Sequence, residues 1–281
     1  MLSDPILHDD EQARLWLAAL AARGTRHAVD VDGCDVVWYQ FGQGEPLVLL
    51  HGGHGSWTHW ARNIEALSTR FSLWVPDLPG YGESGLPHHG DWDSLVDATI
   101  RSIDVLLGAD TPFNLAGFSF GGLVSANIAA RRPGVRRLAL LGPGGHGGPR
   151  RPRGKLLNWK KMLEPEDVKQ ALRHNLWVHM LCADDAIDPL AQRIHTVACD
   201  DTRFRSRTIS QMGGLPEVID QYPGETLFIW GENEVTCTPE YLIEQLVRPH
   251  SNRQARIVPG GGHWIQYEAA DTINRLLLDW F

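Results

Sequence analysis

One serine near the middle of the chain stands between glycines at the end of an apolar run. The run is "NLAGFSFGG", residues 114–122, and it places Ser119 between Gly117 and Gly121. A strained turn from a strand into a helix needs small neighbours at these positions, because larger side chains would collide with the tight backbone. The pattern predicts that Ser119 is a nucleophile lifted above the end of a buried strand.

A carboxylate and a histidine follow two later apolar runs. Glu234 lies in the loop "GENE" after "TLFIW", and His263 follows "ARIVPGG". A serine hydroxyl becomes a strong nucleophile when an imidazole accepts its proton, and a carboxylate at the other ring nitrogen stabilises the imidazolium. The order serine, acid, histidine predicts a triad of Ser119, Glu234 and His263. Glu232, nearer the strand end, is the competing acid.

Two backbone N–H groups are candidates for stabilising the negative charge that develops when a serine attacks a carbonyl group. Gly53 lies in the glycine loop "HGGHG" after an apolar run, and Phe120 directly follows the candidate nucleophile. Preorganised donors of this kind act strongly because they point at the oxyanion before it forms. We expect Gly53 and Phe120 to form the oxyanion hole.

The elements that position these residues are short apolar runs that alternate with helical stretches. A leading helix at 10–23 and a hairpin around Asp32-Gly33 precede them. The expected strands are 46–52, 71–77, 113–119, 136–143, 226–231 and 255–261, and the expected helices are 57–68, 92–107, 120–131 and 265–281. Such alternation predicts an α/β class, doubly wound, mostly parallel sheet with its active groups at the carboxyl ends of strands.

One interval interrupts the alternation. Residues 144–219 contain helical patches at 156–163, 165–182 and 187–198 and no clear buried strand. An interval of this length is too long for a connection in a compact domain unless it forms a unit of its own. We therefore expect a helical cap at 144–219, inserted between two parts of a core domain at 1–143 and 220–281.

The charge of the chain argues against nucleic acid and membrane surfaces as partners. The 281 residues carry 26 Lys and Arg against 34 Asp and Glu, a formal net charge of −8. This excess of negative charge repels phosphate backbones and anionic lipids. One basic cluster runs against the trend and is interpreted as a solvated face. It comprises Arg150, Arg151, Arg153, Lys155, Lys160 and Lys161.

Neither a cofactor nor a metal is predicted. The four cysteines are far apart and contain no C-x-x-C pair, so they are interpreted as reduced thiols. His51 and His54 are close in sequence but have no evident third ligand. The acidic N-terminus and the lack of a long apolar segment predict a soluble, cytoplasmic protein that acts on a small molecule. Its oligomeric state stays open, with a homo-oligomer as one alternative.

As a set, five motifs resemble those of serine hydrolases with the α/β-hydrolase fold, over nearly the whole chain. "HGGHGSWTHW" resembles the oxyanion loop of that family and "PDLPGYGES" its strand-4 loop. "GFSFGG" resembles its nucleophile turn, "IWGENE" its acid loop and "PGGGHW" its histidine loop. The resemblance implies an α/β-hydrolase fold with an inserted cap and a cofactor-independent hydrolase.

Within this fold, the chain looks most similar to the meta-cleavage-product hydrolases, which cleave a C–C bond in 2-hydroxy-6-oxo-dienoates. "GGHWIQYEAAD" matches their His-Trp ending, which implies a substrate contact for Trp264. Arg193 falls where their cap supplies an arginine to the substrate carboxylate. Those enzymes carry Asn immediately before the nucleophile, whereas this chain has Phe118. A phenyl ring cannot hydrogen-bond a dienoate oxygen, so the polar end of that substrate would face an apolar wall.

The departure at Phe118 favours a hydrolase of small or medium carboxylic esters that forms an acyl-enzyme. Phe118, Arg193, Trp264 and His54 are the expected substrate-binding residues. A C–C bond hydrolase of 2-hydroxy-6-oxo-dienoates is a close alternative. A ligand receptor that keeps the triad but turns over slowly is a third hypothesis, because receptors also use this fold.

Overall fold

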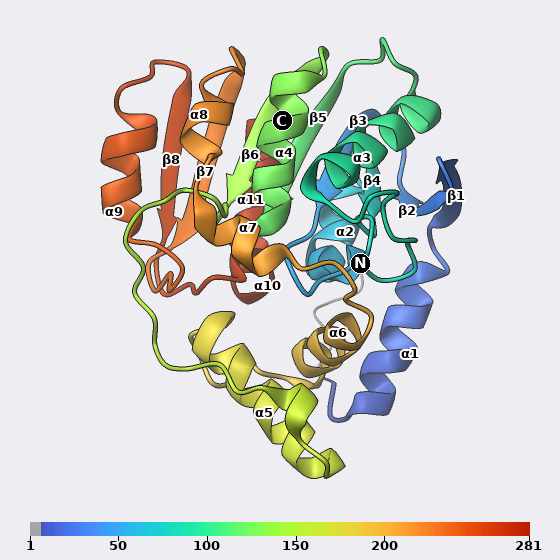
Figure 1. Cartoon of the computed structure of the whole chain (residues 1–281), viewed down its shortest axis with the longest axis vertical. Helices are drawn as coiled ribbons and strands as arrows, with labels where there is room; N and C mark the ends of the chain where they lie inside the picture. The colour runs from blue at the N-terminus through green and yellow to red at the C-terminus, as the bar shows by residue number, and fades with distance from the viewer. Residues whose placement is uncertain (1–6) are drawn as a thin grey trace.

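The computed structural model describes residues 7–281, and a mixed sheet of eight strands lies at its centre (Figure 1). The spatial order of the strands is β1-β2-β4-β3-β5-β6-β7-β8. Strands β1 and β2 form the antiparallel hairpin expected around Asp32-Gly33, where both turn residues have positive φ angles of 53° and 80°. The strands are β1 (Thr25–Val31), β2 (Cys34–Phe41), β3 (Glu45–Leu50), β4 (Phe71–Pro76), β5 (Phe113–Phe118), β6 (Val135–Leu141), β7 (Glu225–Gly231) and β8 (Arg253–Val258).

The sheet is mostly parallel, as the sequence predicts. Strand β2 pairs antiparallel with β4, and every pairing from β4 to β8 is parallel. All six residues of β4 and of β5 are buried, because both faces of the central strands are covered. The expected α/β sheet is therefore confirmed.

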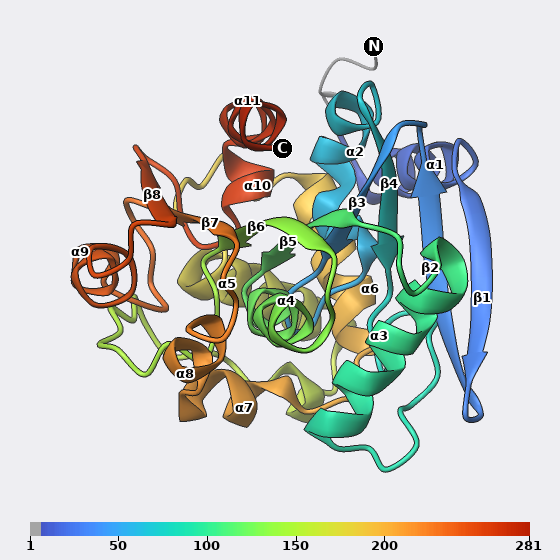
Figure 2. The same cartoon turned by 90° about the horizontal axis from the view of Figure 1, so that it is seen from above.

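Helices cover both faces of the sheet. Figure 2 shows α2 and α11 on one side and α3 and α4 on the other. Successive residues of a strand point to opposite faces, so Leu49 packs in one core cluster with Ile64 and Leu277, whereas Leu50 packs in the other with Leu123. The covering helices are α1 (Asp10–Ala21), α2 (Ala61–Leu67), α3 (Trp92–Leu107), α4 (Phe120–Arg131), α9 (Pro239–Leu242), α10 (Ile265–Glu268) and α11 (Ala270–Trp280).

Between β6 and β7 the chain forms helices and no strand. In Figure 1, α5 (Pro165–His179) and α6 (Pro189–Asp200) lie below the sheet, and α6 packs against α1. Helices α7 (Ser206–Met212) and α8 (Leu215–Ile219) follow. Leu215 and Ile219 pack in the same core cluster as residues of α4, so α8 lies on the sheet side of this interval. The expected cap boundaries at 144 and 219 stay a prediction.

The expected helix at 156–163 is wrong except for the short 3-10 turn η2 (Trp159–Lys161). The backbone of Leu157 bonds to a side chain of α5: its N–H donates to Asn175 Oδ1 at 2.8 Å, and its carbonyl accepts from Asn175 Nδ2 at 3.0 Å. These bonds hold the segment in an irregular conformation along α5. The sequence interpretation also missed α7, α8 and α9, which are short helices of four to seven residues.

Candidate active site

Ser119 occupies a strained turn between β5 and α4. Its φ angle is 53° with ψ at −114°, a region that side-chain-bearing residues rarely adopt. A Cβ at Gly117 would lie 2.3 Å from the carbonyl oxygen of Gly121, and one at Gly121 would lie 2.3 Å from that of His51. The two glycines are therefore required by backbones that pass too close for any side chain.

The predicted nucleophile, base and acid form one hydrogen-bonded chain. Ser119 Oγ lies 3.0 Å from His263 Nε2, and His263 Nδ1 lies 2.9 Å from Glu234 Oε2. An ionised carboxylate only accepts hydrogen bonds, so Nδ1 carries the proton and Nε2 is free to accept from the serine hydroxyl. Glu234 is 1% exposed and His263 is 2% exposed, which shields this chain from solvent.

Glu234 is held in place by more than the histidine. Burial alone raises the pKa of Glu234, but the neighbouring His263 and hydrogen bonds from Thr236 outweigh burial and hold that pKa below its usual value. Thr236 donates to Oε1 from its backbone N at 2.9 Å and from Oγ1 at 3.0 Å. Gly142 supplies the space, because a Cβ there would lie 2.9 Å from Glu234 Oε2.

The competing acid, Glu232, points elsewhere. Its side chain is exposed and accepts a hydrogen bond from the backbone N of Gly260 at 2.9 Å. It therefore ties the acid loop to the loop after β8, while the contact with the imidazole of His263 is made by Glu234.

The expected oxyanion donors, Gly53 and Phe120, both line the cavity above Ser119. Within residues 7–281, neither backbone N–H donates a hydrogen bond, so both are free for a substrate oxygen. The Gly53 loop is braced by His51, whose Nδ1 donates to the carbonyl of Gly52 and whose Nε2 accepts from the N–H of Leu78. Burial lowers the pKa of His51 to about 4, so this brace is neutral near pH 7.

A cavity of about 840 Å³ opens above Ser119 and His263. Phe118 and His54 lie on its floor beside the nucleophile, and their expected contact with substrate stays a prediction. The opposite wall comes from the segment at 150–160, from α5 and α6, and from the start of α7. The polar side chains of that wall include His179, His195, Cys199 and Ser206.

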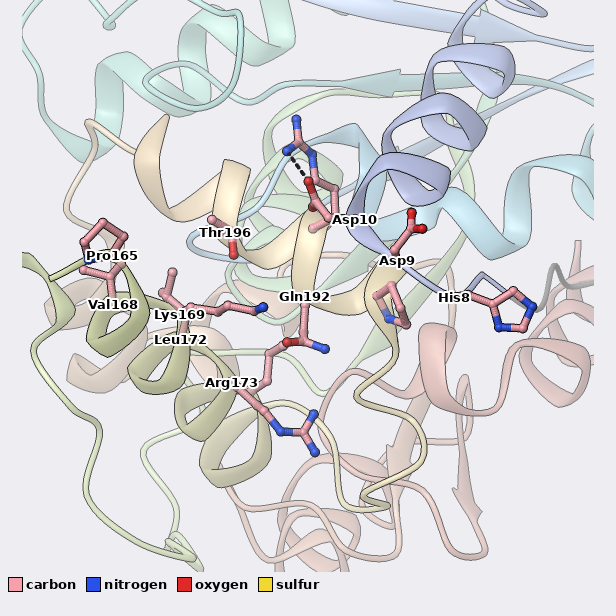
Figure 3. A pocket seen from close by; sticks show the side chains of 13 residues that line it. His8, Asp9, Asp10, Pro165, Val168, Lys169, Leu172, Arg173, Gln192 and Thr196 are labelled. Carbon is pink, nitrogen blue, oxygen red and sulfur yellow. Dashed lines mark hydrogen bonds and ion pairs between the residues drawn. The ribbon is translucent and has the colours of Figure 1, made fainter.

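The structure does not bring Arg193 or Trp264 to this cavity. Arg193 pairs with Asp10 of α1 at 3.1 Å and lines a separate cavity of about 610 Å³ between α1, α5 and α6 (Figure 3). The Trp264 ring is fully buried, and its Nε1 donates to the carbonyl of His59 at 3.1 Å. Both side chains are engaged by other parts of the protein, so this geometry does not support the substrate contacts expected for Arg193 and Trp264, which stay a prediction.

Several cavity and support residues escaped the sequence interpretation. The ring of His179 lies 5.4 Å from that of His263, and burial lowers the pKa of His179 to about 3. His195 also lines the cavity, and burial lowers its pKa to about 4. Thr236 could have been predicted from the sequence as a residue that supports the acid, since it lies two residues after Glu234 in the acid loop. The two histidines had none, because their direction depends on how α5 and α6 pack.

Residues 7–281 contain neither a metal-ligand cluster nor a membrane-spanning helix. No cluster of three or more His, Cys, Asp or Glu side chains within that range is arranged to hold a metal ion. No helix in the same range is long and apolar enough to cross a membrane. The absence of a metal and of a cofactor stays a prediction.

Comparison with known proteins identifies the family. A model described as "Alpha/beta hydrolase family" matches residues 47–276. The chain is 29% identical over 256 residues to a 2-hydroxy-6-oxo-6-phenylhexa-2,4-dienoate hydrolase of Burkholderia cepacia, covering 85% of this chain and 88% of that protein.

Two solved structures have a similar fold. A meta-cleavage product hydrolase variant from Pseudomonas fluorescens has a TM-score of 0.74 at 24% identity, covering 91% of this chain and 97% of that one. A carboxylesterase of Bacillus subtilis has a TM-score of 0.76 at 20% identity, with 96% of both chains covered. From the family match over most of its length and from its fold, the chain belongs to the α/β-hydrolase family.

Proposed function

We propose that this protein is a serine hydrolase that cleaves small or medium carboxylic esters through an acyl-enzyme. The observation that carries the proposal is the continuous hydrogen-bonded chain from Ser119 through His263 to Glu234 at the floor of a cavity. Three residues from the ends of three strands meet at hydrogen-bonding distances, and each has the chemistry that its role needs.

The proposed reaction has two steps. Ser119 Oγ attacks the ester carbonyl while His263 Nε2 takes the hydroxyl proton, and the N–H groups of Gly53 and Phe120 stabilise the oxyanion. The C–O bond to the alcohol then breaks, and His263 returns the proton to the departing alcohol. A water molecule, activated by the same imidazole, attacks the acyl-enzyme, releases the acid and restores Ser119.

Phe118 favours the ester over the dienoate. Phe118 lines the cavity next to Ser119, and its buried ring packs 5.0 Å from the His263 ring. A dienoate oxygen placed against this ring would lose a hydrogen bond that it makes in water. Arg193, the other group expected to hold the dienoate, is paired with Asp10 outside this cavity.

A C–C bond hydrolase acting on a 2-hydroxy-6-oxo-dienoate is the second candidate. It is favoured by the 29% identity to a protein named as a hydrolase of that substrate class, across 85% of this chain. The two candidates use the same serine, base and acid and differ in the bond that breaks. A slow-turnover receptor shares the triad as well.

Steady-state kinetics separate these candidates. We expect a higher kcat/KM on 4-nitrophenyl butyrate than on a 2-hydroxy-6-oxo-6-phenyl dienoate, many turnovers per protein molecule, and loss of ester turnover in Ser119→Ala with the fold retained by circular dichroism. The reverse substrate ranking would establish the C–C hydrolase. A single turnover followed by a stall would establish the receptor.

A further inference from the structure

The cavity above Ser119 is lined by positive charge and by no carboxylate. Among residues 7–281, four cationic side chains line it, from Arg150, Lys155, Lys160 and Arg207, and no Asp or Glu does. The chain as a whole carries a net charge of −8. A concave site of one sign raises the local concentration of ligands of the opposite sign, and it does so more strongly than a flat surface.

These four cations have no acidic partner in the described chain. Some arginines elsewhere are paired, such as Arg132 with Asp104 at 2.6 Å and Arg193 with Asp10 at 3.1 Å, whereas others, such as Arg70, donate to backbone carbonyls. Within residues 7–281, none of the four cavity cations forms an ion pair with a carboxylate. Arg150 donates to the carbonyl of Ser210 at 3.1 Å, and Lys160 Nζ lies 5.1 Å from the centre of the Trp159 ring.

The basic cluster at 150–161 has two parts. Arg150, Lys155, Lys160 and Lys161 are exposed, in agreement with the solvated face expected from the sequence, and the first three of them also line the cavity. Arg151 donates to the backbone carbonyls of Glu234 at 3.1 Å and Glu232 at 2.9 Å, and Arg153 donates to that of Trp177 at 3.0 Å. These two arginines fasten the segment to the acid loop and to α5. With the segment fastened, Arg150, Lys155 and Lys160 line the cavity, and Lys161 does not.

Two of the cations, Lys160 and Arg207, line the same cavity as Ser119, Gly53 and His54. Burial lowers the pKa of His54, and the positive charges of Lys160 and Arg207 lower it further. The charge of Lys160 also acts on the Cys199 thiol of α6. Lys160 lines the cavity from the segment at 150–160, and Arg207 lines it from the first turn of α7.

We propose that this cavity selects ester substrates that carry a carboxylate, bound by Lys160 and Arg207, over neutral esters of the same size. The inference rests on the proposed ester hydrolysis and adds the charge of the substrate to it. A guanidinium binds a carboxylate through two parallel hydrogen bonds, and an ammonium adds a point charge. The carboxylate is held unchanged while Ser119 displaces the alcohol and water then hydrolyses the acyl-enzyme.

A matched pair of substrates tests the selection when the charge is on the acyl side. The 4-nitrophenyl monoester of adipic acid and 4-nitrophenyl hexanoate have acyl chains of equal length and differ in the terminal carboxylate. We expect kcat/KM to be about tenfold to a hundredfold higher for the adipate, as for a hydrogen bond to a charged group. High NaCl should reduce this preference by raising KM for the adipate alone.

The double variant Lys160→Gln/Arg207→Gln tests whether these two side chains bind the substrate carboxylate. It should lose most of the preference through KM for the adipate and keep hexanoate turnover within about twofold, which also shows that it folds. Lys161→Gln is the control, because Lys161 is the next lysine of the same turn and does not line the cavity. If the double variant folds poorly, Lys160→Gln alone should lose part of the preference.

A second pair tests a charge on the alcohol side. 3-Carboxyphenyl butyrate and phenyl butyrate differ in a carboxylate on the leaving group, and a Lys160- and Arg207-dependent preference in either pair supports the inference. Hydrolysis of all four esters with no charge preference, or equal losses on charged and neutral esters in the double variant, would overturn it. Failure to hydrolyse any ester would instead overturn the proposed function.

Discussion

The floor and the wall of the active-site cavity differ in how their polar groups are satisfied. On the floor, Ser119, His263 and Glu234 bond to one another, and Thr236 occupies the remaining carboxylate oxygen. In the wall, cations such as Lys160 face the cavity without an acidic partner among the described residues. Satisfied, buried groups fix one geometry, as bond-making chemistry needs. The wall cations are exposed to solvent, so a ligand can bind them without disturbing the buried floor, and the floor is suited to reaction and the wall to selection.

The largest effect should come from the acid on the floor. Glu234→Gln keeps the size of the side chain but no longer stabilises the imidazolium that forms in the transition state, so kcat should fall by about 10²–10⁴ with little change in KM. Glu232→Gln is the matched control two residues away and should retain near-normal kcat in the same ester assay. The opposite pattern would move the acid to Glu232.

The next largest fall in kcat should come from filling the space beside Gly142. Its φ angle is 49°, and a Cβ would lie 2.9 Å from Glu234 Oε2 and 3.1 Å from His263 Nδ1. Gly142→Ala should displace these atoms and lower kcat by about tenfold to a hundredfold. Gly147→Ala is the control: its φ of 68° carries similar strain of roughly 1–2 kcal/mol, but a Cβ would meet no atom within 4 Å. Equal kcat losses in both variants would show that strain alone acts.

A smaller effect should follow from weakening the hydrogen bonds by which Glu268 connects the segment after α5 to the loop that carries His263. Glu268 accepts from the backbone N–H groups of Cys182 and Ala183 with Oε1, both at 2.8 Å, and from that of Gly262 with Oε2 at 2.6 Å. In Glu268→Gln, one side of this bridge faces an NH₂ group and loses its acceptor. We expect kcat to fall several-fold and the free energy of unfolding by about 1–3 kcal/mol.

Glu240→Gln, at an exposed carboxylate of α9, serves as the control for Glu268→Gln. Stopped-flow and denaturant titrations measure the two effects. Unchanged kcat with lowered stability would mean that the bridge supports the fold but does not position His263.

The buried histidine His195 of the wall should make the free energy of unfolding depend modestly on pH. Burial lowers the pKa of His195 to about 4, whereas an exposed histidine titrates near 6.5. Between these values the unfolded chain binds a proton that the folded chain does not, so stability is present above about pH 6.5 and is lost as the pH falls toward 4. His195→Gln should reduce the loss between pH 7 and pH 5 by roughly 1–2 kcal/mol, measured by urea unfolding. An equal reduction in the exposed His88→Gln control would refute this origin.

The catalytic residues of the floor could be predicted from the sequence, whereas the positions of the wall residues could not. Ser119, Glu234 and His263 each follow a strand, and parallel strands bring their carboxyl ends to one edge, so motif and topology together were sufficient. Arg193 was expected in a helix and lies in one, but its partner, Asp10, is 183 residues away in α1. No local pattern reports such a contact. Lys160 likewise faces the cavity because of tertiary contacts made by its segment.

The proposed hydrolytic mechanism depends most directly on Ser119 as the nucleophile. Reaction with a fluorophosphonate, followed by peptide mapping in a mass spectrometer, measures which side chain attacks an electrophile. We predict one adduct, on Ser119, whose yield rises in proportion to the loss of 4-nitrophenyl butyrate turnover, and no adduct in Ser119→Ala. An adduct on another residue that accompanies the loss of activity, or full ester turnover by Ser119→Ala, would contradict the proposed mechanism.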